Sequence, residues 1–65
     1  MEATEMQKRL IHCLASANIS EPTRVIAFLQ MDDDEQCLQM CEYLSEHKDA
    51  ADPEIMAAAK RIAGE

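Results

Sequence analysis

The chain contains a single glycine, Gly64, so the few signals that can interrupt a regular element stand out. Thr4 with Gln7 forms a capping-box pattern, in which each side chain bonds to the backbone of the other residue. Ser20 would open the second helix, with Pro22 in its first turn, and Asp52 would cap the fourth helix directly before Pro53, since proline is favoured in the first turn of a helix. No segment combines alternating apolar residues with many β-branched ones, so the sequence predicts an all-α fold.

Apolar residues recur at helical spacing in four segments, which are expected to be helices over residues 4–17, 21–30, 33–47 and 53–63. Two helical hairpins packed on each other would form a compact bundle, a single small domain over residues 1–65. The expected core-facing residues, in chain order, are Met6, Leu10, Cys13, Leu14, Ala17, Val25, Ile26, Leu29, Cys37, Met40, Cys41, Leu44, Ile55, Met56, Ala59, Ile62 and Ala63.

Local signals also assign the ends of these helices. Asn18 can close the first helix, because Asn tolerates the left-handed conformation that a helix end often needs. Asp32 with Glu35 forms another capping-box pattern and would start the third helix. The second helix is short and Arg24 is its only base, so we expect it to be the most enclosed of the four.

The formal net charge of −7 is concentrated in one part of the chain. Residues 32–54 hold nine acids and one base, whereas the charges of residues 1–31 balance to zero. Such acidity disfavours direct binding to nucleic acid, which requires Lys and Arg against the phosphates, and to an anionic membrane. The third helix and its start provide either a solvated face or a candidate acidic interaction surface for a basic partner, made of Asp32, Asp33, Asp34, Glu35, Glu42 and Glu46.

Cys37 and Cys41 lie one helical turn apart and could reach the same metal ion. A structural zinc site needs four ligands. Cys13 is one further candidate, but His12 and His47 fall off the apolar faces that carry the thiols. Buried Cys commonly acts as a small hydrophobe, so we expect no metal and no other cofactor. The four acids before Cys37 would also raise its pKa, which disfavours redox chemistry.

Other chemistry has little support in the sequence. A calcium loop that starts at Asp32 would need Gly where Cys37 stands and Glu where Tyr43 stands. There is no glycine-rich phosphate loop and no nucleophile elbow, and four short helices rarely enclose a substrate pocket. We therefore expect no enzymatic activity and no catalytic residues.

The chain has no apolar signal region and no run long enough to span a bilayer, and its three Cys do not form a disulfide framework. We expect a cytoplasmic protein. Its core is thin, with one Phe, one Tyr and no Trp, so a second copy or a partner could complete it.

The sequence predicts a small acidic protein–protein interaction module that docks on another protein or self-associates, for example as a homodimer. The first alternative is an acidic regulator or nucleic-acid mimic that occupies the basic groove of a partner. The second is a small metal or redox protein that uses Cys37 and Cys41.

Overall fold

A computed structural model describes residues 2–64 of the chain. Four helices occur within this range: α1 (Glu5–Ser16), α2 (Glu21–Gln30), α3 (Asp34–Glu46) and α4 (Asp52–Ile62). The described residues contain no strand. The predicted all-α fold of four short helices is confirmed, and each helix begins and ends within one residue of its expected range.

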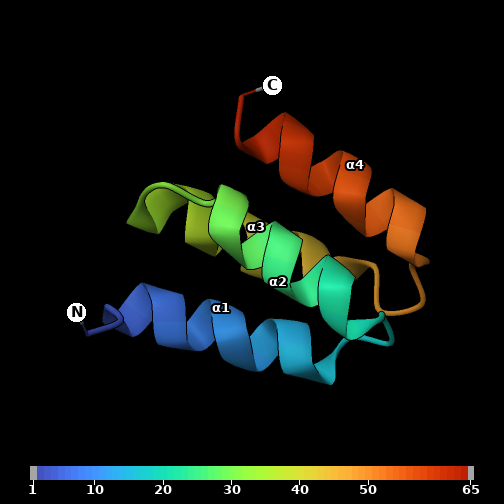
Figure 1. Cartoon of the computed structure of the whole chain (residues 1–65), viewed down its shortest axis with the longest axis horizontal. Helices are drawn as coiled ribbons and strands as arrows, with labels where there is room; N and C mark the ends of the chain where they lie inside the picture. Colours follow the sequence, from blue (N-terminus) through green and yellow to red (C-terminus); the bar gives the residue numbers. More distant parts are fainter. Residues whose placement is uncertain (1, 65) are drawn as a thin grey trace.

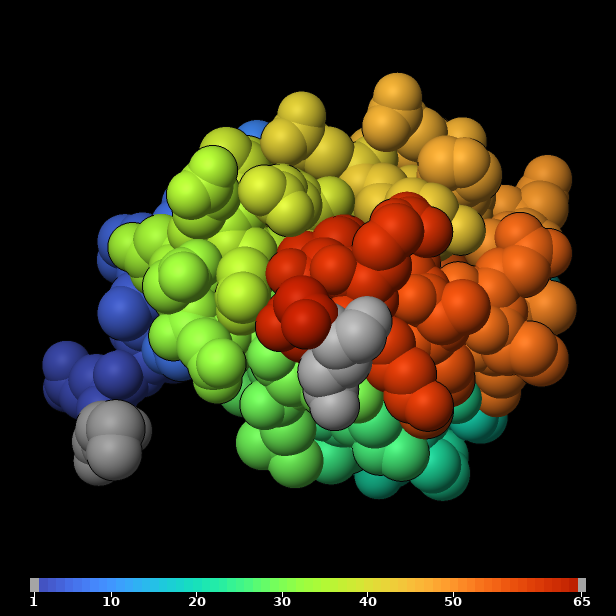
Figure 2. Space-filling view, turned by 90° about the horizontal axis from the view of Figure 1, so that it is seen from above, coloured from blue at the N-terminus to red at the C-terminus, as the bar shows by residue number. Residues whose placement is uncertain are grey.

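The helices form two antiparallel hairpins that pack on each other (Figure 1). α1 packs against α2 and α3, while α4 packs against the same two helices from the other side. In the space-filling view, which is turned by 90° from Figure 1, α2 and α3 lie on opposite sides of α4 (Figure 2). The two middle helices therefore share the core but face away from each other at the surface.

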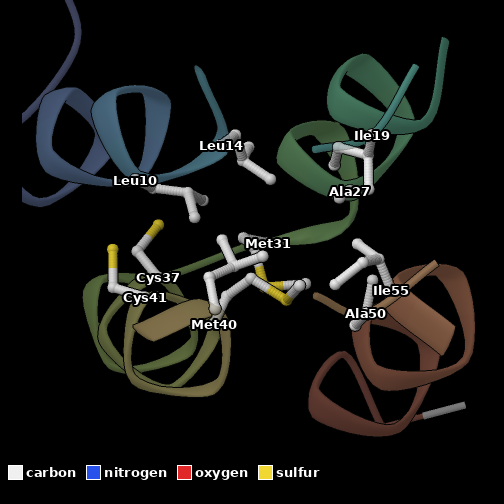
Figure 3. Packing of buried hydrophobic residues seen from close by; sticks show 12 residues of the cluster. Leu10, Leu14, Ile19, Ala27, Met31, Cys37, Met40, Cys41, Ala50 and Ile55 are labelled. Carbon is white, nitrogen blue, oxygen red and sulfur yellow. The ribbon is translucent and has the colours of Figure 1, made fainter. Parts of the chain in front are cut away.

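The core lies where the four helices meet (Figure 3). Its largest fully buried side chains are Leu10, Met40, Ile55 and Cys37, all of which the helical spacing predicts. Each segment between helices adds one further apolar residue, which periodicity alone does not reveal. The buried hydrophobic cluster consists of Leu10, Leu14, Ile19, Ala27, Met31, Cys37, Met40, Cys41, Leu44, Ala50, Ile55 and Ala59.

The orientation expected for α2 is wrong. Val25 and Ile26 are 48% and 40% exposed, and Leu29 is 70% exposed. Thr23 and Ala27 are buried in their place. These two small residues lie one turn apart on the same side, so α2 can approach its neighbours closely through them. In this chain on its own, α2 is therefore not the most enclosed helix.

The capping box at Thr4 and Gln7 is confirmed at the start of α1. The one expected at Asp32 and Glu35 is wrong. Asp33 caps α3 instead, because its carboxylate accepts from the backbone N–H of Gln36 at 2.8 Å. The Gln36 side chain accepts in turn from the backbone N–H of Asp32. Both pairs have suitable spacing, and the observed one leaves Asp32 in the link before α3.

Asn18 does not close α1. Gly64 is the only residue of the described range with a positive φ, at 87°, so Asn18 does not adopt the left-handed conformation. Arg24 of α2 performs the capping instead. Its Nε donates to the carbonyl of Leu14 and its Nη2 to the carbonyl of Ala17, both at 3.0 Å. The Leu14 carbonyl also accepts from the backbone N–H of Ala17, the C-cap residue of α1, at 3.1 Å. Arg24 therefore gives this carbonyl a second donor and bonds to the Ala17 carbonyl beyond the last turn, where helix carbonyls lack intrahelical partners.

The side chain of Asp52 likewise bonds to a helix other than its own. The sequence predicts that it caps the fourth helix, but the N-cap of α4 is Ala51. The Asp52 carboxylate instead accepts from the Ser20 hydroxyl at 2.6 Å and from the Thr23 hydroxyl at 3.1 Å. It also accepts from the Ser20 backbone N–H at 3.2 Å. Asp52 thus ties the start of α4 to the N-terminus of α2 and joins the two hairpins.

Candidate interaction surface

The most unusual surface feature is apolar. The side of α2 that faces away from the core carries apolar residues at the spacing i, i+3, i+4 and i+7, which is the pattern by which one helix docks on another protein. Two residues of α1 lie beside this stripe. We define the α1/α2 apolar surface as Ile11, Ala15, Pro22, Val25, Ile26 and Leu29, all of which are exposed.

The surface is hollowed in two places. A shallow groove of about 240 Å³ runs between α1 and α2, with Ile11 and Ala15 on one side and Phe28 and Leu29 on the other. A second hollow of about 390 Å³ lies over the first turns of α2. Val25 lines both hollows, so they form one continuous apolar surface along α2.

Few charges interrupt this surface. Arg24 borders the groove, but its guanidinium is bonded to the carbonyls of α1. Glu21 borders the hollow at the N-terminal end of α2. Lys8 lies one turn before Ile11 on α1, and its only described ion pair is with Glu5 at 3.8 Å. The side chains of Lys8 and Glu5 are 63% and 93% exposed, so this pair is weak.

The six residues of the predicted acidic surface are all exposed. Two of them are engaged in the fold, since Asp33 caps α3 and Asp34 accepts from the Thr4 hydroxyl at 3.2 Å. Asp32 and Glu35 lie beside them at the start of α3, while the last two follow along the helix. An exposed stripe along α3, the acidic stripe, holds Glu35, Gln39, Glu42 and Glu46.

The cysteines of α3 are buried in the core. Both Cys37 and Cys41 point from α3 towards α1 (Figure 3). Burial raises the pKa of the Cys37 thiol, and the nearby Asp34 and Asp33 carboxylates raise it further. Burial, followed by a hydrogen bond with Cys13, raises the pKa of Cys41 to about 12. Because the thiolate is the reactive and metal-binding form, neither environment favours this chemistry.

The structure brings only two of the candidate metal ligands from different helices together. Cys13 of α1 lies next to Cys41 of α3. His47 stacks on Tyr43 instead, with 4.1 Å between the ring centroids, and His12 is exposed. Among residues 2–64, no group of three or more His, Cys, Asp and Glu side chains is placed to hold a metal ion.

Comparisons of the chain with protein-family models, with curated proteins and with solved structures find no match. In the part of the chain that the structure describes, no helix is both long and apolar enough to cross a membrane. Inference about function therefore starts from the surfaces themselves.

Proposed function

We propose that this chain is a non-enzymatic protein–protein interaction module that binds its partner through the α1/α2 apolar surface. The exposure of Leu29, at 70%, is the observation that carries this proposal. Single exposed apolar residues are ordinary, but here Val25 and Ile26 lie on the same stripe and Ile11 lies beside it. Contiguous apolar patches of this kind mark interaction sites on soluble proteins.

The energetics of burial support this surface. Complete burial of a side chain such as Leu, Ile or Val contributes roughly 1.5–3 kcal/mol relative to full exposure. Ile11, Val25 and Ile26 are already partly covered, so each gains less than Leu29 does. Together the four side chains contribute several kcal/mol, which helps to offset the entropy lost on association.

The acidic stripe of α3 supports a second candidate function, a regulator or nucleic-acid mimic that occupies a basic groove. Glu35, Glu42 and Glu46 are all exposed and unpaired by any described ion pair. Binding of this kind would weaken steeply as salt is added, because exposed charges are screened. Binding through apolar side chains would respond little to salt.

Site-specific photocrosslinking in cells that express the protein tests the first proposal against the second. A photoreactive benzoyl-phenylalanine is placed at position 29 on α2 or, as the matched control, at position 39 on the acidic stripe of α3. We expect a discrete covalent protein adduct from position 29 and none from position 39. An adduct from position 39 alone would support the acidic regulator, and no adduct from either position would contradict both proposals.

Substitutions in the same experiment identify the residues that bind. We expect the adduct from position 29 to be lost when Val25 and Ile26 are both replaced by Ser. It should remain when Glu35, Glu42 and Glu46 are all replaced by Lys. The opposite result would assign the interaction to the acidic stripe.

A further inference from the structure

We propose that the α1/α2 apolar surface binds a second copy of this chain, in a two-fold symmetric dimer in which α2 packs antiparallel against α2 of the other copy. This inference rests on the proposed function and adds the identity of the partner.

The first argument is the composition of α2. From Pro22 to the end of the helix, its only charged residue is Arg24, whose guanidinium is bonded to the carbonyls of α1. Thr23 and Ala27 lie on the side of α2 that is buried against the core, and the exposed apolar stripe lies on the other side of the helix. A helix that is apolar on all sides is typically buried on all sides. The isolated chain covers α2 on one side only.

The second argument is the distribution of charge, which allows two identical acidic chains to meet at this face. Each copy carries −7, so two copies repel each other through most contact surfaces. The α1/α2 apolar surface belongs to residues 1–31, whose charges balance to zero. Six acids lie in α3 or just before it, and α3 lies on the opposite side of α4 from α2 (Figure 2). Asp52 is the exception, because its carboxylate bonds to Ser20 and Thr23 at the start of α2. Contact through α2 keeps the acids of α3 apart, and beyond roughly 8 Å their repulsion is largely screened.

The third argument is the charge at the two ends of the surface. Glu21 stands at the N-terminal end of α2. α1 runs antiparallel to α2 (Figure 1), so Lys8 lies towards the C-terminal end of α2, one turn beyond Ile11. Antiparallel pairing of α2 with its copy places Glu21 of each chain near Lys8 of the other. Parallel pairing would instead bring the two Glu21 side chains together, and like charges repel.

The size of the molecule sets how much of this face the dimer uses. The described chain exposes 4401 Å² and measures 30 × 24 × 21 Å. A standard stable interface buries about 800 Å² on each partner, which is about a fifth of this surface. The stripe of α2 alone is too narrow for that area. The dimer therefore also covers the exposed residues Ile11 and Ala15 of α1.

Sedimentation equilibrium of the untagged, reduced protein tests the dimer, over concentrations from about 1 to about 500 μM, the range of modest affinities. We expect a monomer–dimer equilibrium that changes little with salt. Leu29→Glu should weaken it at least about 10-fold, as loss of a central apolar contact does. The matched control is Leu38→Glu, which makes the same change at an apolar residue of α3 that is 38% exposed, and it should leave the equilibrium unchanged. Circular dichroism of each variant verifies that the helices remain.

Exchange of the end charges tests the antiparallel arrangement. Glu21→Lys and Lys8→Glu should each weaken the dimer, by about 2- to 5-fold for an exposed pair. The double variant should recover most of the loss. The antiparallel arrangement would be overturned if Leu29→Glu abolishes the dimer while the double variant Glu21→Lys with Lys8→Glu does not recover the loss caused by the single charge changes.

A wild-type protein that stays monomeric throughout, or a Leu29→Glu variant that dimerises as well as the wild type, would overturn the proposed dimer. A monomer that still forms a crosslink from position 29 to a different protein would leave the proposed interaction function intact. Absence of both the dimer and the crosslink would contradict the two proposals together.

Discussion

Removal of the Arg24 guanidinium should destabilise the protein although Arg24 is not a core residue. Its two donors bond to the carbonyls of Leu14 and Ala17 at 3.0 Å, and they add to the C-cap bond from the Ala17 N–H that closes α1. Arg24→Met keeps most of the apolar stem that borders the groove and removes both donors. The Ala17 carbonyl then depends on water, and the Leu14 carbonyl keeps only its bond from the Ala17 backbone N–H.

The magnitude follows from the number of bonds and their exposure. A hydrogen bond to a charged group contributes about 1.5–3 kcal/mol net. Arg24 is half-buried, so water replaces part of what the two bonds supply. We therefore expect Arg24→Met to lower the free energy of unfolding by about 2 kcal/mol. In a domain of this size each kcal/mol shifts the melting temperature by roughly 4–8 °C, which gives a decrease of about 10 °C.

Thermal unfolding followed by circular dichroism measures this decrease, at one fixed protein concentration because any self-association also stabilises the fold. Arg24→Lys keeps the positive charge but replaces the two donating nitrogens of the guanidinium by one ammonium nitrogen. Its melting temperature should therefore lie between those of the wild type and Arg24→Met. Asn18→Ala is the matched control and should stay within about 0.5 kcal/mol of the wild type. An Asn18→Ala variant destabilised as much as Arg24→Met would refute the assignment of the α1 cap to Arg24.

Three further predictions test the packing and the titrating groups. Hydrogen bonds from Ser20 lower the pKa of Asp52, so this carboxylate stabilises the fold above its unfolded pKa and ceases to do so as the pH falls through its folded pKa. Urea unfolding at several pH values should therefore find Asp52→Asn less stable than the wild type at neutral pH, with the difference disappearing in acid. Ile55 is 1% exposed, so Ile55→Ala should cost about 2–5 kcal/mol in the same assay, and a cost below about 1 kcal/mol would contradict its central place in the core. In titration with a thiol reagent at pH 8, Cys13 should react first and Cys41, whose pKa is raised to about 12, should react only in unfolded protein; rapid reaction of Cys41 in the folded protein would contradict its burial.

The parts of the fold that local chemistry determines could be predicted from the sequence. The apolar spacing of α3 identifies Cys37, Met40, Cys41 and Leu44 as its buried face, and these residues are buried. The helix starts are also local, because a cap and its partner lie within one turn. Where three Asp residues follow one another, however, the local rule offers more than one register. Asp33 rather than Asp32 is the cap that forms.

The contacts that join the hairpins could not be predicted in the same way. Asp52 and Ser20 are 32 positions apart in the chain, and their bond depends on how α4 lies against α2. Asp52 before a proline carries a strong helix-start signal, and α4 does begin there. This helix-start signal does not reveal that the Asp52 carboxylate bonds to the start of α2. A polar residue beside a helix start therefore predicts where that helix begins more reliably than it predicts which group its own side chain bonds to.

The error at α2 has a different origin, because α2 carries two apolar sides. Val25, Ile26 and Leu29 have the larger side chains, and burial area alone favours them as the core face. Thr23 and Ala27 are smaller but allow close contact with the neighbouring helices, and they are the residues buried. Periodicity cannot rank two stripes on opposite sides of one helix, because both satisfy it. The signal that could have revealed an outward apolar stripe is the presence of both stripes together. A small helical chain has no second layer of its own to cover both stripes, so one of them faces outward.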